Sequence, residues 1–122
     1  MTLLEAINRI DVLKPNGYSQ AEKIQWLSNL DGIVKREIID THEGEAVTFN
    51  DYTEETDLTT KLLVPAPYDD VYLRYLEAQI DYANGEYTKY NNSSEAYNTA
   101  YSTFQRYYNR THMPKGTKFK FF

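Results

Sequence analysis

Apolar residues recur at steps of three and four through most of this chain, and the pattern is strongest at residues 67–110. That stretch also holds ten of the twelve tyrosines. Such spacing places each apolar set on one face of a helix. The polar run at residues 91–94 separates two sets, which predicts an antiparallel helical hairpin with its turn there. The first set is Val71 or Tyr72, Leu76, Ile80, Ala83, Tyr87 and Tyr90, and the second is Ala96 or Tyr97, Ala100, Tyr101, Phe104, Tyr107 and Tyr108.

The first hairpin helix is predicted to continue through Asn84-Gly85, because Tyr87 and Tyr90 keep its phase. Asn92, with Glu95 three residues later, predicts the N-cap of the second hairpin helix. The hairpin therefore has two stripes that face each other. We expect Leu76, Ile80, Ala83, Ala100, Tyr101 and Phe104 to be buried between them.

Two more helices are predicted before the hairpin. Residues 2–13 form a short amphipathic pattern that ends where Pro15 and Gly17 favour a turn. Ser19, with Glu22 three residues later, marks the start of the second helix. That helix is expected to end near residues 41–42, and its inner face is Ile24, Leu27, Leu30 (or Asp31), Val34 and Ile38.

The helical period disappears between residues 43 and 64, where short β-capable pieces flank an acidic, turn-rich run. The fold class that the whole pattern predicts is mainly α. It is a small helical bundle with a central antiparallel helical hairpin, an inserted loop or short β-hairpin at about residues 43–64, and an extended C-terminal tail. Residues 1–110 are expected to form a single helical domain, and residues 111–122 the tail.

Composition narrows the class of protein. The chain has 122 residues and no cysteine, so one domain without disulfides or thiolate metal sites is expected. No apolar run approaches the roughly 20 residues that span a bilayer, and no signal peptide is recognised, so we expect a protein made in a cytoplasm with no membrane partner. Tyrosine combines an apolar ring with a polar tip, which suits both cores and interaction surfaces.

Charge is distributed unevenly along the chain. The net charge is −5, but residues 110–122 carry four basic side chains and no acid. The first 109 residues therefore hold nine basic groups against eighteen acids, and residues 40–57 contain seven acids with no lysine or arginine. Phosphate is repelled by such a body, which argues against a protein that coats DNA.

The sequence offers little support for catalysis or for a cofactor. His42 and His112 lie 70 residues apart in expected loops, and nothing predicts that they meet around a metal. Asp40, Glu43 and Glu45 lie close together but in a solvated stretch, where nothing raises a carboxyl pKa. Phosphate-binding glycine loops and nucleophile elbows are absent from the sequence. We therefore expect no enzymatic activity, no metal and no cofactor.

The order of residues from 62 onward resembles small proteins from tailed-phage and prophage morphogenesis clusters, the head-tail connector (head completion, or adaptor) family. The resemblance covers roughly residues 19–114. The residues that carry it are Leu63-Val64-Pro65, Tyr68, Tyr75-Leu76-Glu77-Ala78-Gln79-Ile80, Tyr82-Ala83-Asn84-Gly85-Glu86, Lys89-Tyr90-Asn91-Asn92, Tyr97-Asn98 and Tyr107-Tyr108-Asn109-Arg110-Thr111-His112-Met113-Pro114.

The resemblance implies a non-enzymatic helical subunit that assembles as a ring, commonly of twelve copies, beneath the portal. Its partners would be itself, the portal protein and the next neck or tail protein, and DNA would pass through without specific binding. Its location would be the neck of the virion, after synthesis in the host bacterial cytoplasm. Two other functions stay open: a small acidic helical binding module that inhibits a host protein, and a small metal- or carboxylate-dependent enzyme that uses His42.

Three groups of residues are candidates for function in the connector interpretation. Tyrosines that fall off the inner stripes are expected to make contacts between subunits: Tyr75, Tyr82 and Tyr108. The acidic segment is expected to face a channel or solvent through Glu43, Glu45, Asp51, Glu54, Glu55 and Asp57. The tail alternates charge and ring, and is expected to dock on the portal or a neighbouring protein through Lys115, Lys118, Phe119, Lys120, Phe121 and Phe122.

Overall fold

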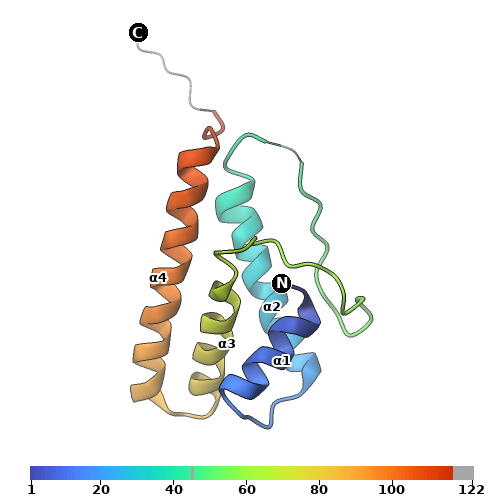
Figure 1. The fold of residues 1–122 in the computed structure, drawn as a ribbon, viewed down its shortest axis with the longest axis vertical. Coiled ribbons are helices and arrows are strands. Elements are labelled where there is room, and N and C mark those ends of the chain that lie inside the picture. Colours follow the sequence, from blue (N-terminus) through green and yellow to red (C-terminus); the bar gives the residue numbers. More distant parts are fainter. Residues whose placement is uncertain (45, 117–122) are drawn as a thin grey trace.

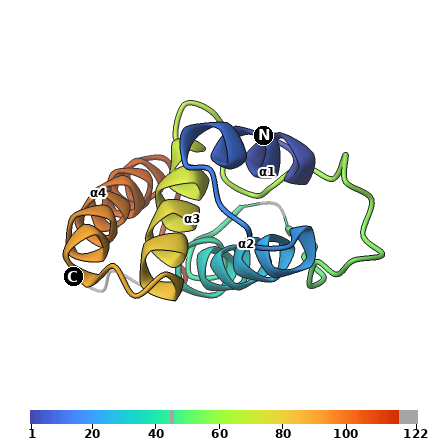
Figure 2. The same cartoon turned by 90° about the horizontal axis from the view of Figure 1, so that it is seen from below.

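The computed structural model describes residues 1–44 and 46–116, and it is mainly α-helical, as predicted. Four α-helices follow one another: α1 (Leu3–Leu13), α2 (Gln20–Val34), α3 (Asp70–Ala83) and α4 (Tyr87–Thr111). A π-helical turn, η1 (Lys35–Ile39), prolongs α2. Helix α3 contacts each of the other three helices, and α4 lies antiparallel beside it at one edge (Figures 1 and 2).

The two N-terminal helices begin at side-chain caps. The hydroxyl of Thr2 accepts the N–H of Glu5 at 3.1 Å, and the Glu5 carboxylate accepts the N–H of Thr2 at 2.8 Å. The predicted cap at Ser19 is confirmed, because its hydroxyl accepts the N–H of Glu22 at 3.1 Å. Each cap satisfies N–H groups that the first helical turn leaves without partners. The predicted inner face of α2 is also confirmed: Ile24, Leu27, Leu30, Asp31, Val34 and Ile38 are all buried.

The hairpin turn lies at residues 84–86, so the prediction of a turn at residues 91–94 is wrong. Helix α3 ends at Ala83, and Gly85 adopts a φ of +74°, which favours glycine. Helix α4 then runs without a break from Tyr87 to Thr111. The predicted N-cap at Asn92 is therefore also wrong, since Asn92 lies inside α4.

Because the turn lies earlier than predicted, some of the residues that were predicted to be buried are exposed or half-buried. Leu76, Ile80 and Phe104 are buried as expected. Ala83 is exposed because it is the last residue of α3, and Ala100 and Tyr101 are half-buried. The core instead draws on α1, α2, α3, the incoming loop and Phe104 of α4, and Tyr72 and Phe104 are its largest fully buried side chains.

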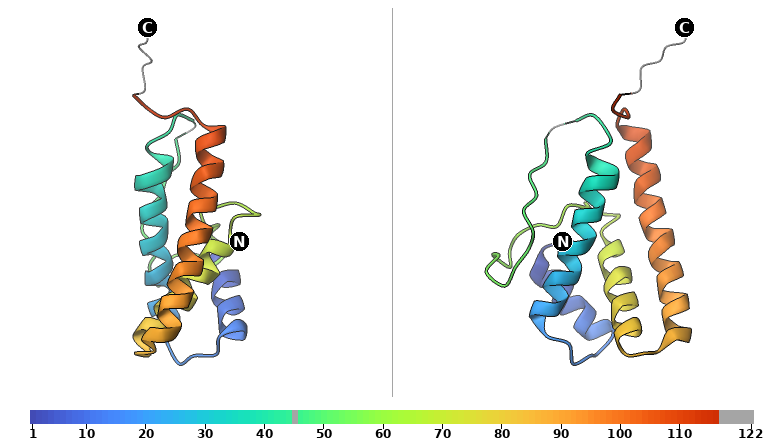
Figure 3. Two further views of the ribbon diagram at one scale, coloured as in Figure 1. Left: turned by 90° about the vertical axis from the view of Figure 1, so that its left-hand side faces the viewer. Right: turned by 180° about the vertical axis from the view of Figure 1, so that it is seen from behind.

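Residues 43–64 form a loop rather than a β-hairpin in the part that the structure describes. The loop runs beside α2, turns at its acidic run and crosses back to the start of α3 (Figures 1 and 3). On its return it pairs with the N-terminus: the Leu3 N–H bonds Thr60 O at 3.0 Å, and the Leu62 N–H bonds Met1 O at 2.9 Å. Residues 2 and 61 make an isolated antiparallel bridge.

The first residues of the predicted tail belong to the folded body. Thr111 lies in α4, the N–H of Glu43 bonds Met113 O at 2.7 Å, and the N–H of Lys115 bonds Thr41 O at 2.8 Å. These bonds attach the end of α4 to the end of the α2–η1 segment. The predicted docking residues Lys118, Phe119, Lys120, Phe121 and Phe122 lie outside the described residues.

Candidate interaction surface

The turn between α3 and α4 presents a cluster of tyrosine rings, which we call the tyrosine cluster: Tyr82, Tyr87 and Tyr90. The ring centroid of Tyr82 lies 5.7 Å from that of Tyr87 and 5.2 Å from that of Tyr90, both edge to face. Tyr82 is 57% exposed and Tyr87 is 59% exposed. Exposed aromatic side chains grouped in this way are typical of protein interfaces.

The other two predicted contact tyrosines are half-buried within the chain. Tyr75 packs edge to face on Tyr97 at 5.1 Å, and burial raises the pKa of Tyr75. Tyr108 lies between two histidines, edge to face with His42 at 5.0 Å and stacked on His112 at 3.8 Å. Of the three predicted contact tyrosines, Tyr82 is therefore the one that offers most of its surface to another molecule.

The acidic segment is exposed along the loop. Glu43, Asp51, Glu54, Glu55 and Asp57 are all exposed, and none makes an ion pair with a described residue, while Glu45 lies outside the described residues. The Asp57 carboxylate accepts the Thr59 N–H at 2.8 Å and its hydroxyl at 2.7 Å, and these bonds lower the pKa of Asp57.

A buried carboxylate anchors this loop to the bundle. Asp31, on α2, is fully buried and accepts the hydroxyl protons of Tyr52 and Tyr72, each at 2.6 Å. The N–H of Leu63 bonds the same carboxylate at 3.1 Å, and the N–H of Val64 bonds the Tyr72 oxygen at 2.6 Å. The network joins α2 and α3 to two points of the loop, residue 52 and residues 63–64.

Burial dominates the electrostatics of this network. It raises the pKa of Asp31, although the three hydrogen bonds oppose the shift. Burial and the neighbouring Asp31 charge raise the pKa of Tyr52 and of Tyr72. Both phenols are therefore protonated donors at neutral pH, which keeps the loop attached.

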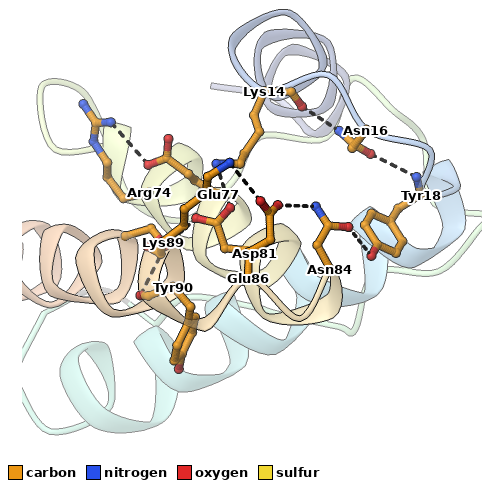
Figure 4. Close-up of polar contacts among 11 residues, drawn as sticks. Lys14, Asn16, Tyr18, Arg74, Glu77, Asp81, Asn84, Glu86, Lys89 and Tyr90 are labelled. Carbon is orange, nitrogen blue, oxygen red and sulfur yellow. Dashed lines mark hydrogen bonds and ion pairs between the residues drawn. The ribbon is translucent and has the colours of Figure 1, made fainter.

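A second polar cluster lies where the α1–α2 connection meets the hairpin (Figure 4). Asp81 is buried on α3, and its Oδ2 accepts the hydroxyl of Ser93 at 2.8 Å. Its Oδ1 receives no hydrogen bond of ordinary geometry from a described residue, but it lies 2.7 Å from the Lys14 ammonium. The Lys14 charge therefore compensates the burial of Asp81. Ser93 points inward to this acid, which explains how the polar run at residues 91–94 can form part of the α4 helix.

Replacing Lys14 with methionine is expected to lower the free energy of unfolding by about 1–3 kcal/mol, because it leaves a buried carboxylate without its counter-charge. The matched control is Lys89→Met. Lys89 pairs with Glu86 at 2.8 Å, but it is 64% exposed and solvent screens the pair, so its loss should lower the free energy of unfolding much less than the loss of Lys14. Urea unfolding measures both variants, and equal losses would contradict this account of Asp81.

The His42 ring links two segments of the fold through both of its nitrogens. Its Nδ1 lies 2.6 Å from Ile38 O, and its Nε2 lies 2.7 Å from Asn109 Oδ1, so the ring joins η1 to α4. Asp40 pairs with Lys35 at 2.8 Å. Within residues 1–44 and 46–116 no three histidine or acidic side chains are close enough to hold a metal ion.

The roles of Asp31, Asp81 and Ser93 were not predicted from the sequence. Asp31 carried a detectable signal, since an acid in phase with the buried stripe of α2 requires buried partners. Ser93 carried a misleading one, because an Asn-Asn-Ser-Ser run is typical of a turn.

None of the described helices is both long and apolar enough to cross a membrane.

Comparisons of the chain with protein-family models, with curated proteins and with solved structures gave no match.

Proposed function

We propose that this chain is a structural subunit of a phage neck, which assembles as a ring beneath the portal and joins the capsid to the tail. The observation that supports the proposal best is that the residues of the head-tail connector resemblance form one contiguous unit. Leu63 bonds Asp31 ahead of α3, the next segments make the α3–α4 hairpin, and Met113 returns to Glu43.

The surface of this unit suits repeated protein contacts. The tyrosine cluster exposes two large rings at the tip of the hairpin, where a neighbouring subunit can cover them. The basic residues that follow α4 in the sequence, Lys115, Lys118 and Lys120, suit an acidic receptor surface on a partner. The two ends of the hairpin thereby serve two different contacts.

The acidic loop supplies the surface that would face DNA. Repeated around a ring, Asp51, Glu54 and Glu55 would line the channel with negative charge that repels the phosphate backbone. DNA could then slide through without adhering. An electron-microscopy structure of the assembled neck tests this placement, and burial of these acids against the lysines of a neighbouring subunit would refute it.

Replacing Tyr82 with alanine should impair ring assembly while changing the free energy of unfolding by less than about 1 kcal/mol, because the side chain is largely exposed. Size-exclusion chromatography with light scattering, in the presence of portal protein, measures assembly. Val12→Ser is the control, since Val12 is 80% exposed on α1 and outside the tyrosine cluster. Unfolding of the Tyr82 variant would show that this face belongs to the core.

Inactivating the gene in the phage or prophage that encodes it tests the function itself. A neck subunit is required for joining heads to tails, so electron micrographs should show separate heads and tails, and complementation with the intact gene should restore virions. Normal virion yield without the protein would refute the neck assignment and favour the alternative of an accessory protein that acts on the host.

A further inference from the structure

An open groove runs along one side of the hairpin, between α4 and the start of α3. It has a volume of about 710 Å³. Helix α4 contributes two alanines and two threonines to its lining, and Pro67 and Tyr68 line it from the segment before α3. The α4 residues that line it are Asn92, Glu95, Ala96, Thr99, Ala100 and Thr103. Small residues at these positions leave room for the side chains of another segment.

The charge of the groove favours a basic occupant. Asp70 and Glu95 are exposed on its rim, and neither makes an ion pair with a described residue. Arg74 is the one cation among the lining residues, and its guanidinium lies 3.7 Å from the Glu77 carboxylate. Two carboxylates are therefore available for a ligand that carries lysines between apolar side chains.

The last five residues of this chain have that chemistry, since residues 118–122 read Lys-Phe-Lys-Phe-Phe. In an extended segment, the rings of Phe119 and Phe121 would point to one side, and the ammonium groups of Lys118 and Lys120, together with the ring of Phe122, would point to the other. The length also agrees. The lining residues of α4 span about 16 Å at 1.5 Å per residue, and five extended residues span about 16 Å at 3.3 Å each.

We propose that this groove receives residues 118–122 of a second copy of the chain. Phe119 and Phe121 would lie on Ala96 and Ala100 beside Tyr68, and Lys118 and Lys120 would pair with Glu95 and Asp70. The groove of one copy and the segment of the next make a head-to-tail contact, which closes into a ring when the rotation between copies allows it. The proposal adds a specific contact between copies to the neck assignment, and the role of that contact in a virion rests on the neck assignment.

The same chain cannot fill its own groove. Thr103 lies at the end of the groove nearest Thr111, about 12 Å from it along α4. A chain that returned over this distance would need about four extended residues, out of the six that follow Gly116. Lys115 is also held at Thr41, on the side of α4 that faces α2 and η1. Only about two residues of the same chain could then enter the groove. A neighbouring copy is the occupant that can fill the whole length of the groove.

Photo-crosslinking of the full chain tests the contact between copies. Phe121 is replaced by benzoylphenylalanine, and equal amounts of ¹⁴N- and ¹⁵N-labelled protein are mixed near the solubility limit and irradiated. Mass spectrometry should find mixed-label cross-links from position 121 to residues 92–103. Same-label cross-links alone, cross-links to another surface, or none would overturn the proposal.

Two substitutions make the test specific to the groove. Ala96→Trp places a large side chain in the groove and should reduce the mixed-label cross-link about tenfold, the equivalent of about 1.4 kcal/mol. Asn98→Trp adds the same bulk at an exposed position of α4 outside the groove and should leave it unchanged. Glu95→Lys should weaken the cross-link without a change in melting temperature, since Glu95 is exposed. Equal cross-linking in all variants would overturn the proposal.

The outcomes separate this inference from the neck assignment. If the cross-links fail while loss of the gene still leaves heads and tails unjoined, the groove contact is wrong and the neck function stands. If the cross-links form while virions assemble normally without the protein, the contact between copies stands and the neck function is wrong.

Discussion

Replacement of Asp31 by alanine is expected to lower the free energy of unfolding by about 3–5 kcal/mol. The carboxylate is the shared acceptor for Tyr52, Tyr72 and the Leu63 N–H, all of which lose their partner inside the protein. Removing the buried charge relieves its own desolvation, which keeps the loss below the sum of three separate bonds. Chemical denaturation followed by circular dichroism measures the effect.

Two further variants locate the cause of that loss. Asp31→Asn keeps one acceptor and should cost less than Asp31→Ala, whereas Asp51→Ala removes an exposed acid of the loop and should stay within about 0.5 kcal/mol. Hydrogen exchange should show faster exchange in the loop of the Asp31→Ala protein than in the other two. A loss as large in Asp51→Ala would refute the anchoring role of Asp31.

The network also predicts a pH dependence with a defined sign. Burial raises the pKa of Asp31 above its ordinary value of 3.8. Between that value and the higher folded-state pKa, the folded protein binds more protons at this site than the unfolded chain, so the Asp31 contribution falls as pH rises and is constant above the window. The stability of the natural protein relative to Asp31→Asn should therefore increase on acidification through this window. An increase on raising the pH would contradict the assignment.

Replacement of Phe104 by alanine is expected to cost about 3–5 kcal/mol, because it leaves a cavity between α3 and α4. Phe104 is 1% exposed, and its ring contacts the rings of Tyr68, Tyr107 and Tyr108 at centroid distances of 5.8–6.2 Å. Leu4→Ala is the control, since Leu4 is 37% exposed on α1. Thermal and urea unfolding check both variants, and similar small losses would show that the hairpin does not depend on this ring.

The N-terminal half of the bundle could be predicted because its signals are local. Thr2 and Ser19 stand at helix starts, and the apolar stripes of α1 and α2 keep one phase from cap to end. Asp31 lies in the buried phase, but its partners come from 21, 32 and 41 residues away. A periodicity argument detects that such an acid is buried and cannot identify what it binds.

The hairpin turn was misplaced because two polar signals compete. Asn84-Gly85 and the run at residues 91–94 both favour turns, and the phase of Tyr87 and Tyr90 favoured the second. The structure uses the first, and Asp81 then contacts buried Ser93 and half-buried Lys14, a contact between three separated segments that the sequence pattern does not reveal. The misplaced turn also led to the wrong prediction for Ala83. Tyr75 and Tyr108 are more buried than predicted because rings from elsewhere in the chain, Tyr97 and His42, pack on them.

The measurement that tests the neck assignment most directly is electron microscopy of the purified chain mixed with the portal protein encoded in the same genome. The assignment predicts a ring of this protein on the exit side of the portal, with the hairpins of successive subunits side by side. The same ring should be lost with Tyr82→Ala and retained with Val12→Ser. Portal particles that carry no added density at saturating protein, with the chain still folded by circular dichroism, would contradict it.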